Sequence, residues 1–383
     1  MQKCLLCKNN KFRKFYSIKS FPMYFGALPK KDSSKIRKFP LEISYCKKCN
    51  LVQQTKKVKE KFMNEVYSSK YYNCPSPKKS GMGVREILKF WTFFKSIKQA
   101  KGKVLEIASF DGYLLSIMKK NGWDVYGCDP ASASKKIAKK KFGKKIRTVF
   151  YQSGTYPKKY FDIIVFRNLL EHIYDYGKFF SSVRYSLKEN GHIFIDVPNV
   201  KAIIKTGSFG VFFHQHISYF SKKTITEILL KYGFKVIKIH EGYPNLFVYA
   251  SKIKKKKIKL KHNNDHIFLN KNLKKSQKIS KKILDFFNNK NNNKIVLFGM
   301  SALATTIVNF LPKNLKKKII LLCDNDTQKH NKVLCGFEQK IKHPKYIEKI
   351  NYDKILICSY FFKKEIVASM IDYVKDKKKI FLI

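Results

Sequence analysis

Two carboxylates flank a turn in residues 103–121, which read KVLEIASFDGYLLSIMKKN. Glu106 lies near the end of a short apolar run, and Asp111 lies among small residues that lead into a helical apolar pattern. A strand, a tight turn and a helix that begins at the turn form the ligand-binding end of an α/β unit, because the first N–H groups of the helix are free to bind a ligand. The segment therefore predicts a binding site for a nucleotide-like molecule.

The residues of this turn indicate which molecule it binds. A dinucleotide fingerprint has three glycines, whereas the turn has Gly112 alone. Glu106 and Asp111 would repel a phosphate and suit a cationic ligand with hydroxyl groups. S-adenosylmethionine has an amino group, a sulfonium and a ribose but no phosphate, so it fits. Asp129, 23 residues after Glu106, ends the next apolar run, where a ribose diol would be held. The alternative is an ordinary βαβ turn with a solvated Asp111.

Four of the nine cysteines form two C-x2-C pairs that are separated by 38 residues: Cys4 with Cys7, and Cys46 with Cys49. Two such pairs supply four thiolates, which complete a tetrahedral zinc site, and the flanking lysines favour the thiolate form. Four protein ligands leave no open position on the metal, so the sequence predicts a structural Zn2+. Redox pairs or free thiols are the alternative.

Two histidines lie in residues 209–221, which read FGVFFHQHISYFS. If the segment is extended, His214 and His216 lie on the same face. An imidazole has an unperturbed pKa near neutrality, so one of the two can act as a general base. A metal held by both histidines, and an aromatic loop in which they only pack and cap, are the alternatives.

Apolar runs alternate with helical patterns between residue 101 and about residue 252. This alternation predicts an α/β fold with a mostly parallel sheet and helices on both faces. Asn168 and His172 follow one of the central runs, at the edge where open α/β sheets bind ligands. The seven expected strands are 103–107, 124–128, 146–150, 161–166, 192–197, 234–240 and 246–251.

The rest of the chain divides into four further parts. In the last of these, the turn after the first strand holds only Gly299, and Asp324 and Asp326 end the second strand, so independent cofactor binding is not expected there. The parts are a zinc-binding domain (1–60), a helical and tyrosine-rich connector (61–100), a linker with a bridging helix (253–293) and a second, smaller Rossmann-like domain (294–383).

Lysine and arginine outnumber the acidic residues by 81 to 26, which gives a formal net charge of +55. Such a charge is typical of proteins that bind nucleic acids. Here the lysines are spread over every segment, and the arginines that read bases are few, so the sequence favours an anionic small substrate over nucleic acid. No apolar run approaches the roughly 20 residues of a membrane span, and no signal-peptide region is evident. We therefore expect a cytoplasmic protein, monomeric or homodimeric.

Several segments together resemble the sugar C-methyltransferases: CxxC…FPLEISYCKKCNLVQ, EIASFDGYLL, FHQHISYFS and a C-terminal FG turn followed by CDND. The resemblance covers essentially the whole chain. It implies a zinc module, a class I methyltransferase core with a seven-stranded Rossmann-like sheet and a C-terminal Rossmann-like domain. It also implies S-adenosylmethionine-dependent methylation of a carbon in a nucleotide-linked keto sugar, through an enolate. The implied site residues are His216 as base, Tyr67 in the substrate pocket, Glu106, Ala108, Asp111 and Gly112 beside the cofactor, and Asp129 on its ribose.

The chain departs from this family's Tyr-His-Glu-His pattern at two positions. Phe213 lacks a phenol that would stabilise an enolate, and Gln215 lacks a carboxylate that would raise the basicity of a histidine. Methylation of a sugar hydroxyl or amine, and a catalytically decayed, zinc-stabilised scaffold, therefore stay open. A nucleic-acid methyltransferase of the adenine-N6 type is disfavoured, because FRNLLEH stands where a (D/N)PP(Y/F) turn is needed.

Overall fold

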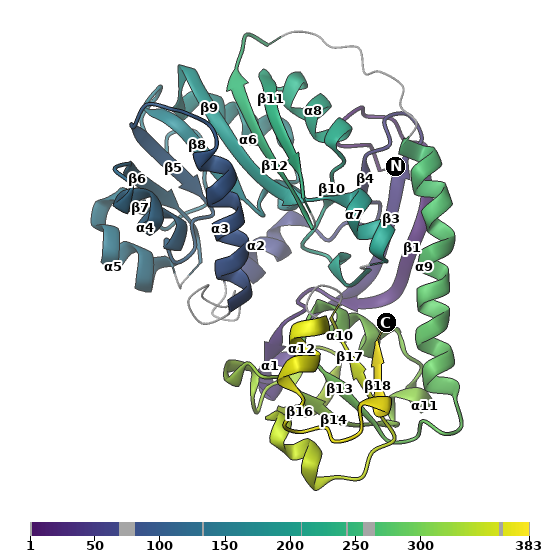
Figure 1. Ribbon diagram of the computed structural model, residues 1–383. Helices are drawn as coiled ribbons and strands as arrows, with labels where there is room; N and C mark the ends of the chain where they lie inside the picture. The colour runs from purple at the N-terminus through teal and green to yellow at the C-terminus, as the bar shows by residue number, and fades with distance from the viewer. Residues whose placement is uncertain are drawn as a thin grey trace. The chain divides into compact units, whose positions relative to one another are not determined.

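The computed structural model describes residues 2–68, 81–131, 134–207, 209–242, 244–255, 265–359 and 363–382 (Figure 1). Residues 69–80 of the tyrosine-rich connector and residues 256–264 of the linker lie outside these ranges. The chain forms two compact units, and the division cuts through the segment 1–60, so the five-part domain division stays a prediction. The first unit contains Met1–Arg13, Ser44–Ala202 and His216–Asn264; the second contains Lys14–Ile43, Ile203–Gln215 and Asp265–Ile383.

A seven-stranded sheet forms the centre of the first unit, with the strand order β11-β12-β9-β8-β5-β6-β7. Strand β12 runs antiparallel to both of its neighbours, and the other pairings are parallel. The predicted, mostly parallel sheet is thereby confirmed. Strand β7 is shorter than expected, and β9 begins five residues earlier. The strands are β5 (Lys103–Ile107), β6 (Asp124–Cys128), β7 (Ile146–Arg147), β8 (Phe161–Arg167), β9 (Leu187–Pro198), β11 (Phe234–Glu241) and β12 (Asn245–Lys252).

Helices cover both faces of this sheet because successive strand residues point to opposite sides. Val104 packs in a cluster with residues of α3 (Gly81–Lys95) and α4 (Tyr113–Lys120). Leu105 packs in another cluster with residues of α6 (Tyr176–Ser186) and α8 (Lys222–Lys231). The first unit also contains α2 (Glu60–Ser68) and the short α5 (Lys139–Phe142). The division of the chain into the two units falls within α7 (Val200–Thr206).

A second, four-stranded sheet has the order β1-β3-β4-β10 and was not predicted. In the first unit, β10 pairs antiparallel with β4, so that Ser218 lies opposite Gln53 and Tyr219 opposite Val52. This pairing fixes the chain directly after His216. The strands are β1 (Phe12–Pro22), β3 (Lys38–Cys46), β4 (Val52–Gln54) and β10 (Ser218–Tyr219).

The second unit contains its own seven-stranded sheet, with the order β18-β17-β13-β14-β16-β15-β2. Strands β13, β14, β16, β17 and β18 pair in parallel, as a Rossmann-like unit requires, and β15 pairs antiparallel with β16 and β2. The strands are β2 (Ala27–Leu28), β13 (Ile295–Phe298), β14 (Ile319–Cys323), β15 (Val333–Leu334), β16 (Phe337–Lys342), β17 (Lys354–Ile357) and β18 (Ile380–Leu382). The helices are α1 (Lys30–Ser33), α9 (Asp265–Asn288), α10 (Ala302–Phe310), α11 (Lys313–Lys316) and α12 (Lys363–Ser369).

No helix in the described ranges is both long enough and apolar enough to span a membrane.

Candidate functional site

The turn between β5 and α4 has a tight, left-handed backbone. Ala108, Phe110 and Gly112 have φ values of 61°, 44° and 70°. Positive φ is rare for residues with a side chain, and such residues cluster at functional sites. The predicted residue Asp111 accepts the N–H of Tyr113, the first residue of α4, at 3.0 Å. The tight turn that the sequence predicted is therefore present, although Phe110 gave no sequence signal for it.

Asp129 braces this turn from the end of β6. Its Oδ2 accepts the N–H of Phe110 at 3.0 Å, and its Oδ1 accepts the N–H of Ala131 at 2.8 Å. Burial raises the pKa of Asp129, and these two backbone hydrogen bonds oppose that rise. Because each carboxylate oxygen has a further lone pair, Asp129 can still accept hydroxyl donors.

Glu106 is buried under the same turn, with 4% of its surface exposed. Burial raises the pKa of Glu106 to about 8; Arg167 acts against this rise, and Asp111 and Asp129 add to it. Its Oε2 has no hydrogen-bond partner among the described residues. Three acidic side chains thus gather at one turn, an arrangement that repels phosphate and attracts a positively charged group.

The next two strands also end in charged residues. Arg167 at the end of β8 lies with its Nε 3.3 Å from Oδ2 of Asp196 on β9, and Asn245 donates to Oδ1 of Asp196 at 2.7 Å. The predicted residue Asn168 has a φ of 46°, is exposed, and donates its N–H to the carbonyl of Asp196 at 2.8 Å. Arg167 and Asp196 were absent from the predicted site, although both stand at strand ends in the sequence.

Four side chains from different elements meet beside the end of β8, and we call them the histidine–carboxylate group: Tyr67, Glu171, His172 and His216. Oε1 of Glu171 lies 3.9 Å from Nε2 of His216 and 4.0 Å from Nε2 of His172. The two imidazole rings lie 4.9 Å apart in an edge-to-face arrangement. The hydroxyl of Tyr67 lies 2.9 Å from Nδ1 of His172. The structure thus brings Tyr67 and His216, which lie far apart in the sequence, to one site.

Backbone hydrogen bonds hold this group in place. Glu171 and His172 belong to the 3-10 turn η3 (Leu170–His172), and the carbonyl of Glu171 accepts the N–H of Ile217 at 2.7 Å. Gln54 on β4 donates its Nε2 to the carbonyl of His216 at 2.6 Å. The sequence analysis missed Glu171, although it adjoins His172 in the motif LLEHI.

Glu171 is the most deeply buried member of the group. Its exposed fraction is 0%, and neither carboxyl oxygen has a hydrogen-bond partner among the described residues. Burial raises the pKa of Glu171 well above its usual range, and the charge of Asp196 adds to the rise. A positive charge that forms on either imidazole would therefore stabilise the ionised carboxylate.

His214 occupies a different environment from His216. Residues 214–215 form a turn, so the expected extended segment with both histidines on one face is wrong. The His214 side chain is buried in the second unit, with its Nε2 3.1 Å from the carbonyl of Phe21 and 3.2 Å from that of Phe39. Burial lowers the pKa of His214 to about 4, so the ring is neutral at pH 7. These contacts favour a structural role.

The two cysteine pairs adopt the same local conformation. The N–H of Lys8 bonds to the carbonyl of Cys4 at 3.0 Å, and the N–H of Asn50 bonds to the carbonyl of Cys46 at 2.9 Å. Lys8 and Asn50 have φ values of 62° and 61°. Each pair therefore forms a tight turn that directs two sulfurs to the same side.

The sulfurs of the two pairs converge. Sγ of Cys4 lies 3.5 Å from that of Cys49, Sγ of Cys7 lies 3.4 Å from that of Cys46, and all four lie within 4.8 Å of one another. A tetrahedral zinc with Zn–S bonds of about 2.3 Å has sulfurs about 3.8 Å apart. Hydrogen bonds within the cluster, chiefly from Cys4, lower the pKa of Cys7 to about 7. The four predicted residues thus have the spacing and chemistry of an S4 metal site.

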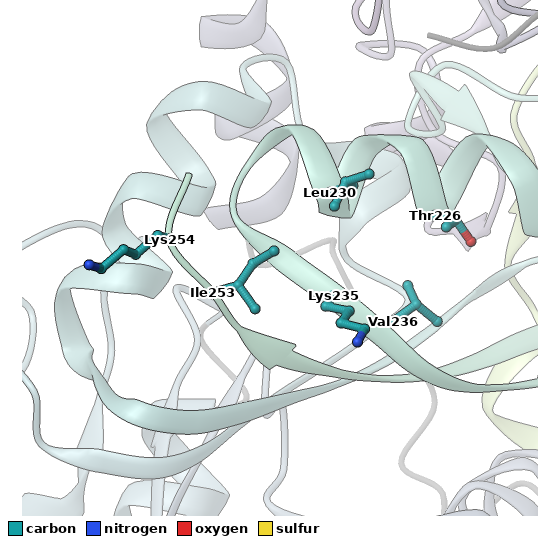
Figure 2. A pocket seen from close by; sticks show the side chains of 6 residues that line it. All are labelled: Thr226, Leu230, Lys235, Val236, Ile253 and Lys254. Carbon is teal, nitrogen blue, oxygen red and sulfur yellow. The ribbon is translucent and has the colours of Figure 1, made fainter. Parts of the chain in front are cut away.

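A separate pocket of about 670 Å³ lies between α8, β11 and the residues after β12 (Figure 2). None of its lining residues belongs to the predicted site. Figure 2 shows Thr226 and Leu230 on the helix and Lys235 and Val236 on the strand; Ile253 and Lys254 complete the lining.

Comparison with known proteins identifies the central region. Residues 83–239 match the family model for a methyltransferase domain. This central part of the chain is therefore similar to methyltransferase domains. Its seven-stranded sheet has the class I methyltransferase fold: β12 is antiparallel and lies between β9 and β11, and the other pairs of strands are parallel. Residues 291–381 match a second family model, described as C2185-like, N-terminal.

Relatives of the methyltransferase domain are distant. The chain is 23% identical over 247 residues to the C-methyltransferase NovU of Streptomyces niveus, and the match covers 63% of this chain and 57% of that relative. A solved 1,6-didemethyltoxoflavin-N1-methyltransferase from Burkholderia thailandensis is 14% identical, with a TM-score of 0.41, over 61% of this chain and 100% of that one. A methyltransferase structure from Aquifex aeolicus is 17% identical, with a TM-score of 0.37, over 51% and 100%.

The buried carboxyl of Glu106 predicts a fall in the free energy of unfolding as the pH rises from about 4.5 to about 8. In this window the carboxyl ionises in the unfolded chain, where its pKa is 4.5, but stays protonated in the folded chain, where its pKa is about 8. The unfolded state therefore gains stability with pH, by at most about 1.4 kcal/mol per pH unit.

Urea denaturation of the wild type and of Glu106→Gln at pH 5.5, 6.5 and 7.5 measures this effect. The stability of the variant relative to the wild type should increase with pH. The same substitution at the exposed Glu65 of α2 is the control and should leave the slope unchanged. Parallel pH dependences for Glu106→Gln and the wild type would contradict the prediction.

Proposed function

We propose that the chain is an S-adenosylmethionine-dependent methyltransferase that methylates a carbon of a nucleotide-linked keto sugar. The observation that best supports a proton-abstracting reaction is the histidine–carboxylate group beside the end of β8. A general base needs an imidazole of suitable pKa next to groups that orient it. The name of the relative NovU supports carbon as the acceptor atom.

The turn after β5 is the proposed cofactor site. Asp111 would attract the positive charges of S-adenosylmethionine, and a bound positive charge would favour the ionised form of Glu106, which is otherwise protonated near neutral pH. The unused lone pairs of Asp129 would accept the ribose hydroxyls of the cofactor. The small residues Ala108 and Gly112 would let the cofactor approach the backbone of the turn closely. Asn168 borders the same edge of the sheet. When bound, the cofactor supplies an electrophilic methyl group on a sulfonium.

His216 is the proposed base. It removes the acidic proton beside the ketone, so that the C–H bond breaks, an N–H bond forms, and the electron pair passes onto the carbon and the ketone oxygen. Tyr67 orients His172 through the contact with its Nδ1, and these two residues are proposed to stabilise the developing negative charge. They would thus replace the phenol that Phe213 lacks.

Methylation of a sugar hydroxyl or amine is the second candidate. Phe213 packs on Phe25, with ring centroids 4.2 Å apart, and therefore acts as an apolar side chain in the second unit. A hydroxyl or amine acceptor needs a base, which His216 supplies, but needs no enolate stabilisation.

A screen for methyl transfer tests the proposal. The protein is incubated with S-adenosylmethionine and a panel of nucleotide-linked keto sugars, and mass spectrometry should show a gain of about 14 Da in one of them, the mass of CH2. His216→Ala should lower the rate by about 100-fold or more because general-base catalysis is lost.

Alanine at His240, an exposed histidine of β11, is the matched control and should leave the rate unchanged. Full activity of His216→Ala would remove His216 from the mechanism. Calorimetry with S-adenosylhomocysteine provides a separate readout: the absence of saturable binding by the wild type would contradict the methyltransferase proposal itself.

We further propose that Cys4, Cys7, Cys46 and Cys49 bind one structural Zn2+. The converging sulfurs support this, as do two N–H groups that donate to Sγ of Cys46, from Lys48 at 3.4 Å and from the Asn9 side chain at 3.5 Å. Such outer contacts orient a thiolate ligand. A site with four protein ligands has no open position for substrate.

Metal analysis of the purified protein should find about one zinc per chain, and Cys46→Ser should lose the zinc and lower the thermal unfolding midpoint. Cys335→Ser, at a buried cysteine of the second unit, is the control and should keep the zinc. A folded wild type that lacks zinc and whose four thiols react freely would contradict the assignment.

A further inference from the structure

We propose that Glu171 is a positioning residue that orients His216 and stabilises the imidazolium that forms when His216 takes a proton. This inference rests on the proposed function, because it assigns a partner to the proposed base.

The geometry supports this role. The Glu171 carboxyl is fully buried, and its Oε1 lies 3.9 Å from Nε2 of His216. The main chain of Glu171 is tied to the residue after His216 by the 2.7 Å bond from Ile217. The side chain of Glu171 therefore lies within ion-pair distance of the imidazole, and its main chain fixes the residue that follows His216. A substrate cannot reach a carboxyl with no exposed surface, so Glu171 acts through the histidines.

The chemistry requires such a partner. When His216 accepts a proton, a positive charge appears in a poorly solvated place, where its exposed fraction is 9%. An opposite charge at about 4 Å stabilises the imidazolium much more strongly there than it would in water, because the local dielectric constant is lower. Gln215, the chain neighbour of His216, is a neutral amide and cannot supply that charge. Glu171 can, from a different element of the fold.

Other ionisable groups also lie near the imidazole of His216. Among the described residues, η3 contributes His172 beside Glu171, α2 contributes Tyr67 through its contact with His172, and β10 contributes Tyr219, whose ring lies 5.6 Å from that of His216. Asp196 on β9 acts on Glu171 but is already paired with Arg167. Of the groups in these contacts, the Glu171 carboxyl is the acidic one beside the imidazole of His216.

Replacement of Glu171 by Gln keeps the shape of the side chain and removes its charge. The imidazolium then becomes less stable, so the pKa of His216 should fall and the acid limb of the kcat profile should move to lower pH. We expect kcat to fall by about 10- to 100-fold, with KM for S-adenosylmethionine and the affinity for S-adenosylhomocysteine within about twofold of the wild type. A purely structural role would change stability and cofactor affinity without moving the acid limb.

Two further variants sharpen the test. Glu171→Asp keeps the charge and should restore part of kcat and the wild-type acid limb. Glu227→Gln, at a buried glutamate of α8, is the matched control and should leave the pH profile unchanged. An unchanged kcat and acid limb in Glu171→Gln would overturn the proposal. If Glu171→Gln fails to fold, an Asp variant with a reduced kcat and the acid limb of the wild type supports the proposal, and an Asp variant whose acid limb moves to lower pH overturns it.

An NMR titration of His216 in 15N-labelled protein separates this inference from the proposed function. It measures the pKa of the imidazole with S-adenosylhomocysteine bound and needs no sugar substrate. A lower pKa in Glu171→Gln than in the wild type supports the pairing even if no methyl transfer is found. Equal values overturn the pairing even if the enzyme is active.

Discussion

The backbone hydrogen bond from Ile217 to the carbonyl of Glu171 is the constraint on which the proposed site depends. It joins the turn after β8 to the segment that carries His216. The pairing of β10 with β4 then fixes the other side of this segment, because Gln54 bonds both to Ile217 through its N–H and to His216 through its side chain. These bonds keep the two imidazoles and the buried carboxyl close to one another.

In both Rossmann-like turns of the chain, the carboxylate of one aspartate accepts two backbone N–H groups, but the turns differ in charge. In the first unit, Asp129 accepts the N–H of Phe110 and of Ala131. In the second unit, Asp324 accepts the N–H of Met300 at 2.6 Å and that of Asp326 at 2.8 Å.

Lys329 lies 2.9 Å from Asp324 and neutralises it, whereas the turn of the first unit gathers Glu106, Asp111 and Asp129. The acidic turn suits a cationic ligand. A shared backbone architecture therefore does not make the two turns chemically equivalent, which is why cofactor binding is proposed for the first alone.

The sequence predicted those parts of the fold that local patterns determine. Strands β5 and β6 begin and end at the expected residues because each five-residue stretch opens on a polar residue and is otherwise mostly apolar. The four metal-site cysteines came from spacing alone. In contrast, β10 has two residues and forms only because β4 lies beside it, so no periodicity could reveal it.

The site was predicted less completely than the fold. His216 came from the residues and from the family resemblance, and Tyr67 came from the resemblance. Glu171 looks in sequence like any helix-adjacent glutamate, and only its complete burial beside two imidazoles distinguishes it. An extended segment would place His214 and His216 on one face, but residues 214–215 form a turn, so this condition is not met.

Hydrogen exchange in heavy water tests the central claim, that His216 abstracts a proton from carbon. The wild type is mixed with S-adenosylhomocysteine, which carries no methyl to transfer, and with the sugar nucleotide that it methylates, and NMR follows the hydrogen beside the ketone. The account predicts that deuterium enters this position and that His216→Ala slows the exchange to the uncatalysed rate. Methylation of the same sugar by the wild type without any exchange at that carbon would contradict the account.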